Sequence, residues 1–220
     1  MELIDGIEWR VSDGLVAYDE ALAFMETRAA AIRAGTDREC VWLLEHPPLF
    51  TAGTSADPAE LSNAMDFPVH DAGRGGRYTY HGPGQRVGYL MLDLERRGKD
   101  VRKLVCSLED WIIATLSRLG VSAHRAPGRI GIWVGDGADE AKIAALGIRI
   151  KRWVTLHGFS LNVEPELAHF AGIVPCGIRE FGVTSLRQIG KETSMTRVDS
   201  ALKREFPYFL NDLSAKDKVS

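Results

Sequence analysis

The chain has 220 residues, 45% of them hydrophobic and 26% charged, which is the composition of a soluble globular protein with one domain. Its 27 basic and 30 acidic residues give a formal net charge of −3, which excludes the basic excess of proteins that bind bulk nucleic acid. Three cysteines without a C-x-x-C pair argue against a disulfide framework or a zinc ribbon and favour a reducing compartment.

Membrane and export signals are not predicted. The longest stretch without Asp, Glu, Lys or Arg covers residues 167–178, whereas a membrane-spanning helix needs about twenty apolar residues. The acidic N-terminal sequence also lacks the basic region of a secretory signal. We therefore expect a cytoplasmic protein that makes no membrane contact.

Two long helices are predicted, followed by a weaker one. The first spans about residues 15–34 and ends at Gly35, a residue type that favours helix ends. The second follows Asp100 as N-cap, has apolar residues at three- and four-residue spacing, and ends at Gly120. A weaker helix over residues 195–205 is expected to stop before Pro207.

Short strand-like runs occupy most of the remaining chain. They cover residues 40–45, 77–80, 87–93, 130–134, 142–150 and 153–163. Because these runs do not alternate regularly with helices, they favour an α+β domain with a mixed, mostly antiparallel sheet flanked by helices. Neither a dinucleotide-binding nor a P-loop glycine motif occurs. We expect one catalytic domain over residues 1–212 and a polar tail over residues 213–220.

The segment of residues 74–85 combines five glycines or prolines with two arginines and a histidine. One interpretation is a simple hairpin with turns at residues 75–76 and 82–84. The other is a ligand site, since glycine lets a ligand approach the backbone while Arg74 or His81 points toward it. The position of His81 beside a turn, outside an apolar run, favours the second interpretation.

Cys176 is the candidate nucleophile. It lies between proline and glycine, whereas Cys40 opens an apolar strand and Cys106 lies on an amphipathic helix, so both read as packing residues. A reactive thiol needs a nearby cation or base. Lys142, His81 and His157 are the candidates for that role, and their spacing does not choose among them.

Five ordered motifs between Val41 and about Leu186 resemble those of the lipoyl(octanoyl) transferase family of lipoate biosynthesis. They are Glu45-His46-Pro47-Pro48 with Phe50-Thr51-Ala52-Gly53, the block from Arg74 to Gln85, Lys142 to Gly147, His157-Gly158-Phe159 to Val163, and Pro175-Cys176-Gly177. The resemblance implies a domain like the catalytic domains of biotin and lipoate protein ligases.

The resemblance also implies an acyltransferase that needs no cofactor or metal and performs the first step of endogenous lipoate synthesis. The octanoyl donor is octanoyl-acyl carrier protein. The acceptors are lipoyl domains of 2-oxoacid dehydrogenase complexes and the glycine cleavage H protein. Cys176 forms an acyl-thioester, and Lys142 lowers its pKa or acts as base. Three stretches border the acyl chain: Arg74, Gly75, Gly76, Arg77, Tyr78, Thr79, Tyr80 and His81; Ala145, Leu146 and Gly147; and Gly158, Phe159 and Ser160.

Two alternatives share this fold. An ATP-dependent lipoate or biotin ligase activates the acid as an adenylate and needs no nucleophilic cysteine, so Cys176 weighs against it. A non-enzymatic acyl-binding module forms no covalent adduct. For the acidic carrier protein we predict a local basic docking patch of Arg149, Lys151, Arg152 and Arg86, beside the motifs.

Overall fold

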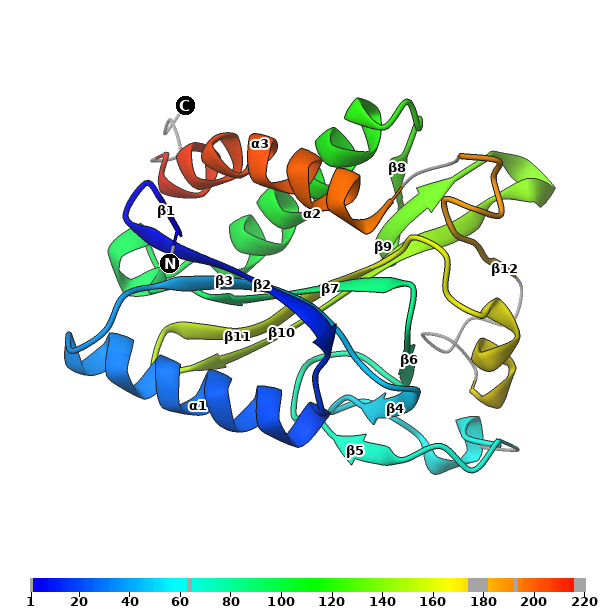
Figure 1. Cartoon of the computed structure of the whole chain (residues 1–220), viewed down its shortest axis with the longest axis horizontal. Helices are drawn as coiled ribbons and strands as arrows, with labels where there is room; N and C mark the ends of the chain where they lie inside the picture. The colour runs from blue at the N-terminus through cyan, green and yellow to red at the C-terminus, as the bar shows by residue number, and fades with distance from the viewer. Residues whose placement is uncertain (1, 63–64, 174–181, 192–193, 216–220) are drawn as a thin grey trace.

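The fold has three layers, with a large sheet between two helices on one side and a third helix with a small sheet on the other (Figure 1). The computed structural model describes residues 2–62, 65–173, 182–191 and 194–215. Cys176 and its neighbours in the Pro-Cys-Gly motif lie outside the described residues.

The large sheet is mixed and mostly antiparallel. Its strand order is β1-β2-β3-β7-β11-β10-β9-β8, and β12 pairs with β10. Only the β2–β3 and β10–β12 pairings in this sheet are parallel within the described part of the chain. The strands are β1 (Glu2–Ile4), β2 (Ile7–Leu15), β3 (Cys40–Glu45), β7 (Gln85–Met91), β8 (His124–Ala126), β9 (Arg129–Val134), β10 (Ala141–Lys151), β11 (Val154–Asn162) and β12 (Gly182–Val183). The predicted fold class is confirmed.

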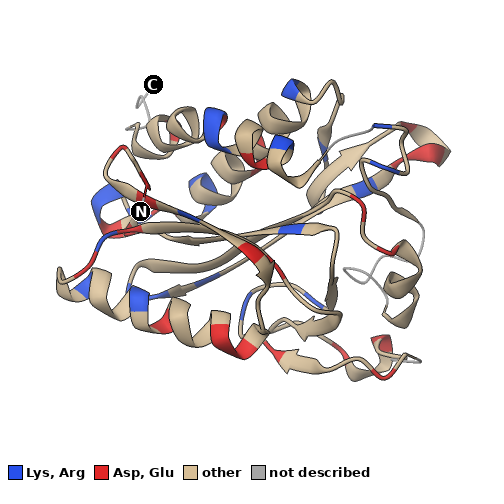
Figure 2. Ribbon diagram, viewed as in Figure 1, with Lys and Arg blue, Asp and Glu red and all other residues tan. Residues whose placement is uncertain are grey.

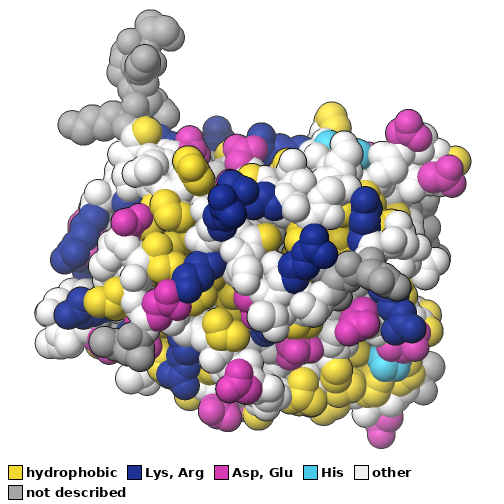
Figure 3. Space-filling view, turned by 45° about the horizontal axis from the view of Figure 1, so that its top comes forward, with side chains coloured by type: hydrophobic (Ala, Val, Ile, Leu, Met, Phe, Trp, Pro, Cys, Tyr) yellow, Lys and Arg dark blue, Asp and Glu magenta, His cyan; other side chains and the backbone are white. Residues whose placement is uncertain are grey.

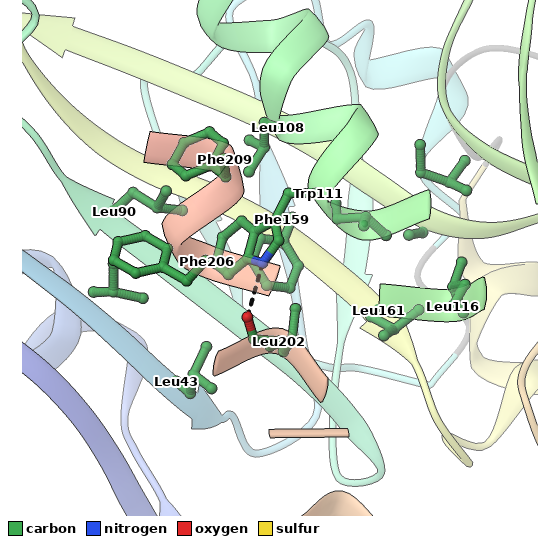
Figure 4. Close-up of a cluster of buried hydrophobic side chains, with 14 of the residues drawn as sticks. Leu43, Leu90, Leu108, Trp111, Leu116, Phe159, Leu161, Leu202, Phe206 and Phe209 are labelled. Carbon is green, nitrogen blue, oxygen red and sulfur yellow. Dashed lines mark hydrogen bonds between the residues drawn. The ribbon is translucent and has the colours of Figure 1, made fainter. Parts of the chain in front are cut away.

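Helices α2 (Val101–Arg118) and α3 (Met195–Ser214) cover one face of the sheet. As predicted, Asp100 caps α2, since its side chain accepts a hydrogen bond from the Lys103 N–H. The core beneath these helices centres on Trp111, whose indole N–H donates to the Leu202 carbonyl at 2.9 Å (Figure 4). No described helix is both long and apolar enough to cross a membrane.

Helix α1 (Tyr18–Ala34) and a three-stranded sheet cover the opposite face. The small sheet consists of β4 (Leu49–Ala52), β5 (Val69–Asp71) and β6 (Thr79–His81), in the order β5-β4-β6. Short 3-10 helices connect other elements: η1 (Pro58–Glu60), η2 (Leu94–Arg97), η3 (Gly137–Asp139) and η4 (Leu167–Gly172). Because β6 pairs with β4 and β7 belongs to the large sheet, the simple hairpin interpretation of residues 74–85 is wrong.

Two helix boundaries differ from the prediction. Helix α1 ends before the left-handed Gly35, as predicted. It begins at Tyr18 and not at residue 15, because Leu15 is the last residue of β2. Helix α3 continues through Pro207, whose missing N–H costs a helix about 3 kcal/mol. Four apolar side chains near it are buried, and each burial contributes about 1.5–3 kcal/mol: Phe206, Phe209, Leu210 and Leu213. Leu213 and Ser214 thus belong to α3, although the sequence placed them in the tail.

Candidate active site

A channel runs along three neighbouring strands of the large sheet. Facing residues of β10, β11 and β7 form two successive rows, Ala145 with Ser160 and Val87, and Gly147 with Gly158 and Tyr89. Residues of the 74–79 segment and Thr51 of β4 line the other side. The channel holds about 500 Å³, part of it open to solvent. Its small side chains suit a narrow, unbranched ligand.

A second pocket of about 280 Å³ continues the channel toward Lys142. The two pockets share Thr79, Ala145 and Ser160 as lining residues, so they lie side by side. Gln85 and Asn162, which face each other across β7 and β11, also line the second pocket. The sheet therefore places Lys142 at one end of the channel and the row of Gly147, Gly158 and Tyr89 toward the other.

A β-bulge turns Lys142 toward this channel. Trp133 and Ile132 are adjacent on β9, but their partners on β10 are Lys142 and Ala144, so Ile143 is an extra residue. Ile143 and Ala144 both pack into the core beneath α2 and α3. The strand alternation restarts after them, which brings Lys142 to the same face as Ala145.

The side chain of Lys142 is 6% exposed. Its Nζ donates a hydrogen bond to the Ile130 carbonyl at 2.9 Å and lies 5.0 Å from the centroid of the Trp133 ring. A carbonyl acceptor and an aromatic face are the contacts that a buried ammonium group requires. A Cβ at Gly131 would lie 3.0 Å from the Lys142 Cε, so glycine makes room for this side chain.

His157 forms the opposite end of the channel. Its backbone has a left-handed φ of +62°, and its N–H donates to the Met25 sulfur on α1 at 3.2 Å. The imidazole is 2% exposed, and its Nε2 is hydrogen-bonded to the Tyr18 hydroxyl at 3.0 Å. The preceding residue, Leu156, packs in the core beneath α1. The irregular backbone thus aims His157 into the channel, on the same side as Leu156.

Arg74 holds the segment that covers the channel. Its guanidinium donates to the carbonyl oxygens of Gly75, Arg77 and Thr51 at 2.9–3.1 Å and to the Thr51 hydroxyl at 2.7 Å. Its aliphatic stem crosses Gly147, where a Cβ would lie 2.7 Å from the Arg74 Cδ. The glycine on β10 therefore permits this close approach.

The histidines and tyrosines at the His157 end are uncharged at neutral pH. The Val16 carbonyl accepts from His46 Nδ1 at 2.6 Å, so His46 Nε2 accepts from the Tyr89 hydroxyl at 2.7 Å. Burial lowers the pKa of His46 to about 4 and, together with the charge of Arg74, that of His157 to about 3. Burial also raises the pKa of Tyr18 to about 12. The rings that line this end of the channel are therefore neutral.

A directed hydrogen-bond chain joins His81 to the strand that carries Lys142. His81 Nδ1 donates to Gln85 Oε1 at 2.6 Å, and the Gln85 amide donates to Asn162 at 2.9 Å. The Asn162 amide donates to the Thr184 carbonyl, and the Thr184 N–H donates to the Lys142 carbonyl, both at 2.9 Å. Burial and the nearby His46 hold the pKa of His81 well below its ordinary value, which makes it a weak proton acceptor.

The structure brings most of the predicted site residues together. Arg74, Gly76, Arg77, Tyr78, Thr79, His81, Ala145, Leu146, Gly147, Gly158, Phe159 and Ser160 line the channel, and Lys142 lines its continuation. Gly75 and Tyr80 are not among the described lining residues. The Gly75 N–H donates to the Ile148 carbonyl, and the Tyr80 hydroxyl is hydrogen-bonded to His169 at 2.8 Å.

Four lining residues were not predicted from the sequence: Tyr18, Thr51, Val87 and Tyr89. Tyr18 lies at the start of α1 and carries no local signal. The Val-Gly-Tyr sequence of β7 does carry one, since a glycine inside an apolar strand marks a close approach. A Cβ at Gly88 would lie 2.3 Å from the Phe159 ring, which confirms that contact.

The two described cysteines differ in exposure. Cys40 is fully buried as predicted, and burial raises the pKa of its thiol to about 12, so its thiolate is inaccessible. The expectation that Cys106 is buried is wrong, because this residue lies on the exposed side of α2.

The predicted basic patch is partly neutralised. Arg149 and Lys151 share one face of β10, as predicted, and both pair with Glu26 of α1, at 3.1 and 3.7 Å. Charges of both signs are interspersed along α1 (Figure 2) and over the face of the molecule that Figure 3 shows. The inclusion of Arg86 is wrong, because this residue is 3% exposed and pairs with Asp199 at 2.8 Å.

Comparison with known proteins places this chain in a family. The family model described as the lipoyl protein ligase A/B catalytic domain matches residues 17–207. An octanoyltransferase of Sphingopyxis alaskensis is 64% identical over 96% of this chain and 97% of its own. An octanoyltransferase of Rhizorhabdus wittichii is 61% identical over 97% of this chain and 96% of its own.

The fold is also similar to solved structures. One is the bipartite lipoate protein ligase of Thermoplasma acidophilum, studied with its E2 lipoyl domain. It has a TM-score of 0.67 and 16% sequence identity, and the match covers 93% of this chain and 84% of that one. At this identity the similarity shows the fold alone.

Proposed function

Since the chain belongs to the octanoyltransferases of the lipoyl protein ligase A/B catalytic-domain family, we propose that it moves an octanoyl group from an acyl carrier protein to a lysine of lipoyl domains. The acceptors are the lipoyl domains of 2-oxoacid dehydrogenase complexes and the glycine cleavage H protein. The chain works as an acyltransferase in lipoate biosynthesis.

One observation carries the proposal: a channel floored by small residues has a buried lysine in the pocket beside one end and neutral, buried rings at the other. The small residues of β10 and β11 accept a straight alkyl chain. The thioester carbonyl then lies toward Lys142, the buried amine beside this end of the channel.

In the first half-reaction the Cys176 thiol gives its proton to Lys142, which leaves a thiolate beside an ammonium group. The Cys176 thiolate attacks the carbonyl of the donor thioester, a new C–S bond forms, and the bond to the carrier sulfur breaks. The carrier leaves as a thiol with the proton from Lys142. A cation beside the thiol favours the thiolate, which is the reacting form.

In the second half-reaction the neutral amine of the acceptor lysine attacks the octanoyl-Cys176 thioester. The C–N bond forms, the C–S bond to Cys176 breaks, and the surplus amine proton goes to Lys142 or the released thiolate. Val183, shortly after Cys176 in the chain, pairs with Lys142 on β10, which supports a Cys176–Lys142 pair. His157 is the weaker candidate base, because it lies at the far end of the channel.

Intact-mass measurement tests this proposal. Incubation with octanoyl-acyl carrier protein, without ATP, should add one octanoyl group to the wild-type chain and to Cys40→Ala and Cys106→Ala, but not to Cys176→Ala. Transfer by Cys176→Ala at the wild-type rate would contradict the covalent mechanism. Transfer only from octanoate with ATP would indicate a ligase, and bound thioester without an adduct would indicate a binding module.

A further inference from the structure

His157 combines two features that each cost free energy. Its φ of +62° is a left-handed conformation that only a few per cent of non-glycine residues adopt, histidine more often than most. Its Nδ1 is buried and has no hydrogen-bond partner among the described residues. An unpaired buried polar atom lowers stability. Because neither feature supports the fold, the position of this imidazole calls for a functional explanation.

The imidazole lies where an acyl chain in the channel would end. The channel passes Ala145 and Ser160, then Gly147 and Gly158, and reaches His157. From Ser160, in the row where the two pockets adjoin, three residues of β11 lead to His157 and span about 10 Å, at ~3.3 Å per residue. This is close to the length of an extended eight-carbon chain.

The end of the channel is also held in place. The Tyr18 hydroxyl fixes His157 Nε2, and Tyr89 packs edge-to-face against the imidazole with ring centroids 5.7 Å apart. Leu156 and Met25 belong to the core beneath α1, directly behind His157. A chain longer by two methylenes would therefore have to displace a buried, hydrogen-bonded ring from packed surroundings.

We propose that His157 is the end stop that sets the longest acyl group this enzyme transfers efficiently, a specificity role that rests on the proposed octanoyl transfer. The left-handed backbone is what places the ring across the channel. With regular strand alternation the side chain at this position would point to the other face of the sheet, where α2 and α3 pack.

The test is the chain-length profile of kcat/KM for C6, C8, C10, C12 and C14 acyl-pantetheine donors. His157→Gly removes the ring and suits the left-handed backbone, which offsets part of the stability lost with the packed ring and the Tyr18 hydrogen bond, so the variant should still fold with a lowered Tm. The ratio of kcat/KM for C12 over C8 should rise about tenfold or more. His157→Asn, a shorter side chain that tolerates a positive φ, should shift the ratio less, in the same direction.

Trp153→Gly is the matched control. Trp153 also has a positive φ, +66°, but it is 37% exposed and lies in the turn between β10 and β11, away from the channel. This variant should relieve backbone strain and leave the C8 preference unchanged.

The outcomes are separable. If the wild-type chain transfers none of these acyl groups, the proposed function fails. If it transfers C8 best and folded His157→Gly keeps the same profile, the end-stop role is overturned. If His157→Gly does not fold, His157→Asn decides: a shift toward C10 or C12 supports the role, and an unchanged profile refutes it.

Discussion

The two ends of the channel are each made by a break in the alternation of a strand, yet they differ in charge. At the Lys142 end an extra residue, Ile143, turns a lysine into the channel, where a carbonyl and an indole ring hold it. At the His157 end a left-handed residue turns an imidazole inward, and burial keeps it neutral. The same kind of backbone irregularity thus serves reactivity at one end and enclosure at the other.

The largest effect is expected at the reacting end. Lys142→Ala should lower kcat/KM for a small octanoyl thioester by about 10²–10⁴-fold, because the proton carrier is lost. Alkylation of Cys176 by iodoacetamide, measured against pH, should show a raised apparent pKa of its thiol.

Lys151→Ala is the control, since this lysine lies on the same strand but is 49% exposed. It should leave both readouts unchanged. An alkylation profile that Lys142→Ala does not move would exclude Lys142 as activator and favour His81.

A smaller effect, on stability, is expected where strands meet between the two ends. Gly158→Ala should lower the free energy of unfolding by about 1–3 kcal/mol, because the new Cβ would lie 2.2 Å from the Gly88 carbonyl oxygen. Gly14→Ala on β2, with no atom within 4 Å of the new Cβ, should change it by less than about 0.5 kcal/mol. Equal urea midpoints for the two variants would show that β7 can move away from β11.

Because His157 is buried in its neutral form, the free energy of unfolding should depend on pH. The pKa of His157 is about 3 in the folded chain and near 6.5 when unfolded, so the unfolded state binds more protons between these values. The contribution of neutral His157 to the free energy of unfolding is therefore fully present above pH 6.5. Below that pH it falls by about 1.4 kcal/mol per pH unit.

Urea unfolding between pH 4.5 and 7.5 measures this slope. His157→Asn should reduce this slope by the equivalent of about one bound proton. A slope that His157→Asn leaves unchanged would assign the acid sensitivity to His46 and His81.

The smallest effect is expected on the docking of octanoyl-acyl carrier protein. Arg149→Ser with Lys151→Ser should weaken the use of octanoyl-acyl carrier protein about two- to fivefold and flatten its salt dependence. Glu26→Gln should act in the opposite direction, because Glu26 neutralises both residues. A small octanoyl thioester should be used equally well by all three chains. Equal losses on both donors would assign these residues to the fold.

The sequence predicted what depends on local pattern. Asp100 and the spacing of apolar residues predicted α2, and most residues of the predicted site segments line the channel. The alternation of side chains along a strand could not predict that Lys142 and His157 point toward the channel. The bulge beside Lys142 and the positive φ of His157 depend on pairing with strands that are distant in the sequence. Tyr18 was missed for the same reason: it reaches His157 across 139 positions of the chain.

The hairpin of β10 and β11, which lines the channel, has a consequence for how the protein folds. β10 and β11 are joined by a two-residue turn, Arg152 and Trp153, both with positive φ, and they pair over eight residues. Such hairpins form in about 1–10 μs, whereas the pairing of β7 with β11 closes a far longer loop and is slower. Lys142 and His157 lie on the two arms of this hairpin, so we expect the framework for recognising the acyl chain to be among the first contacts formed.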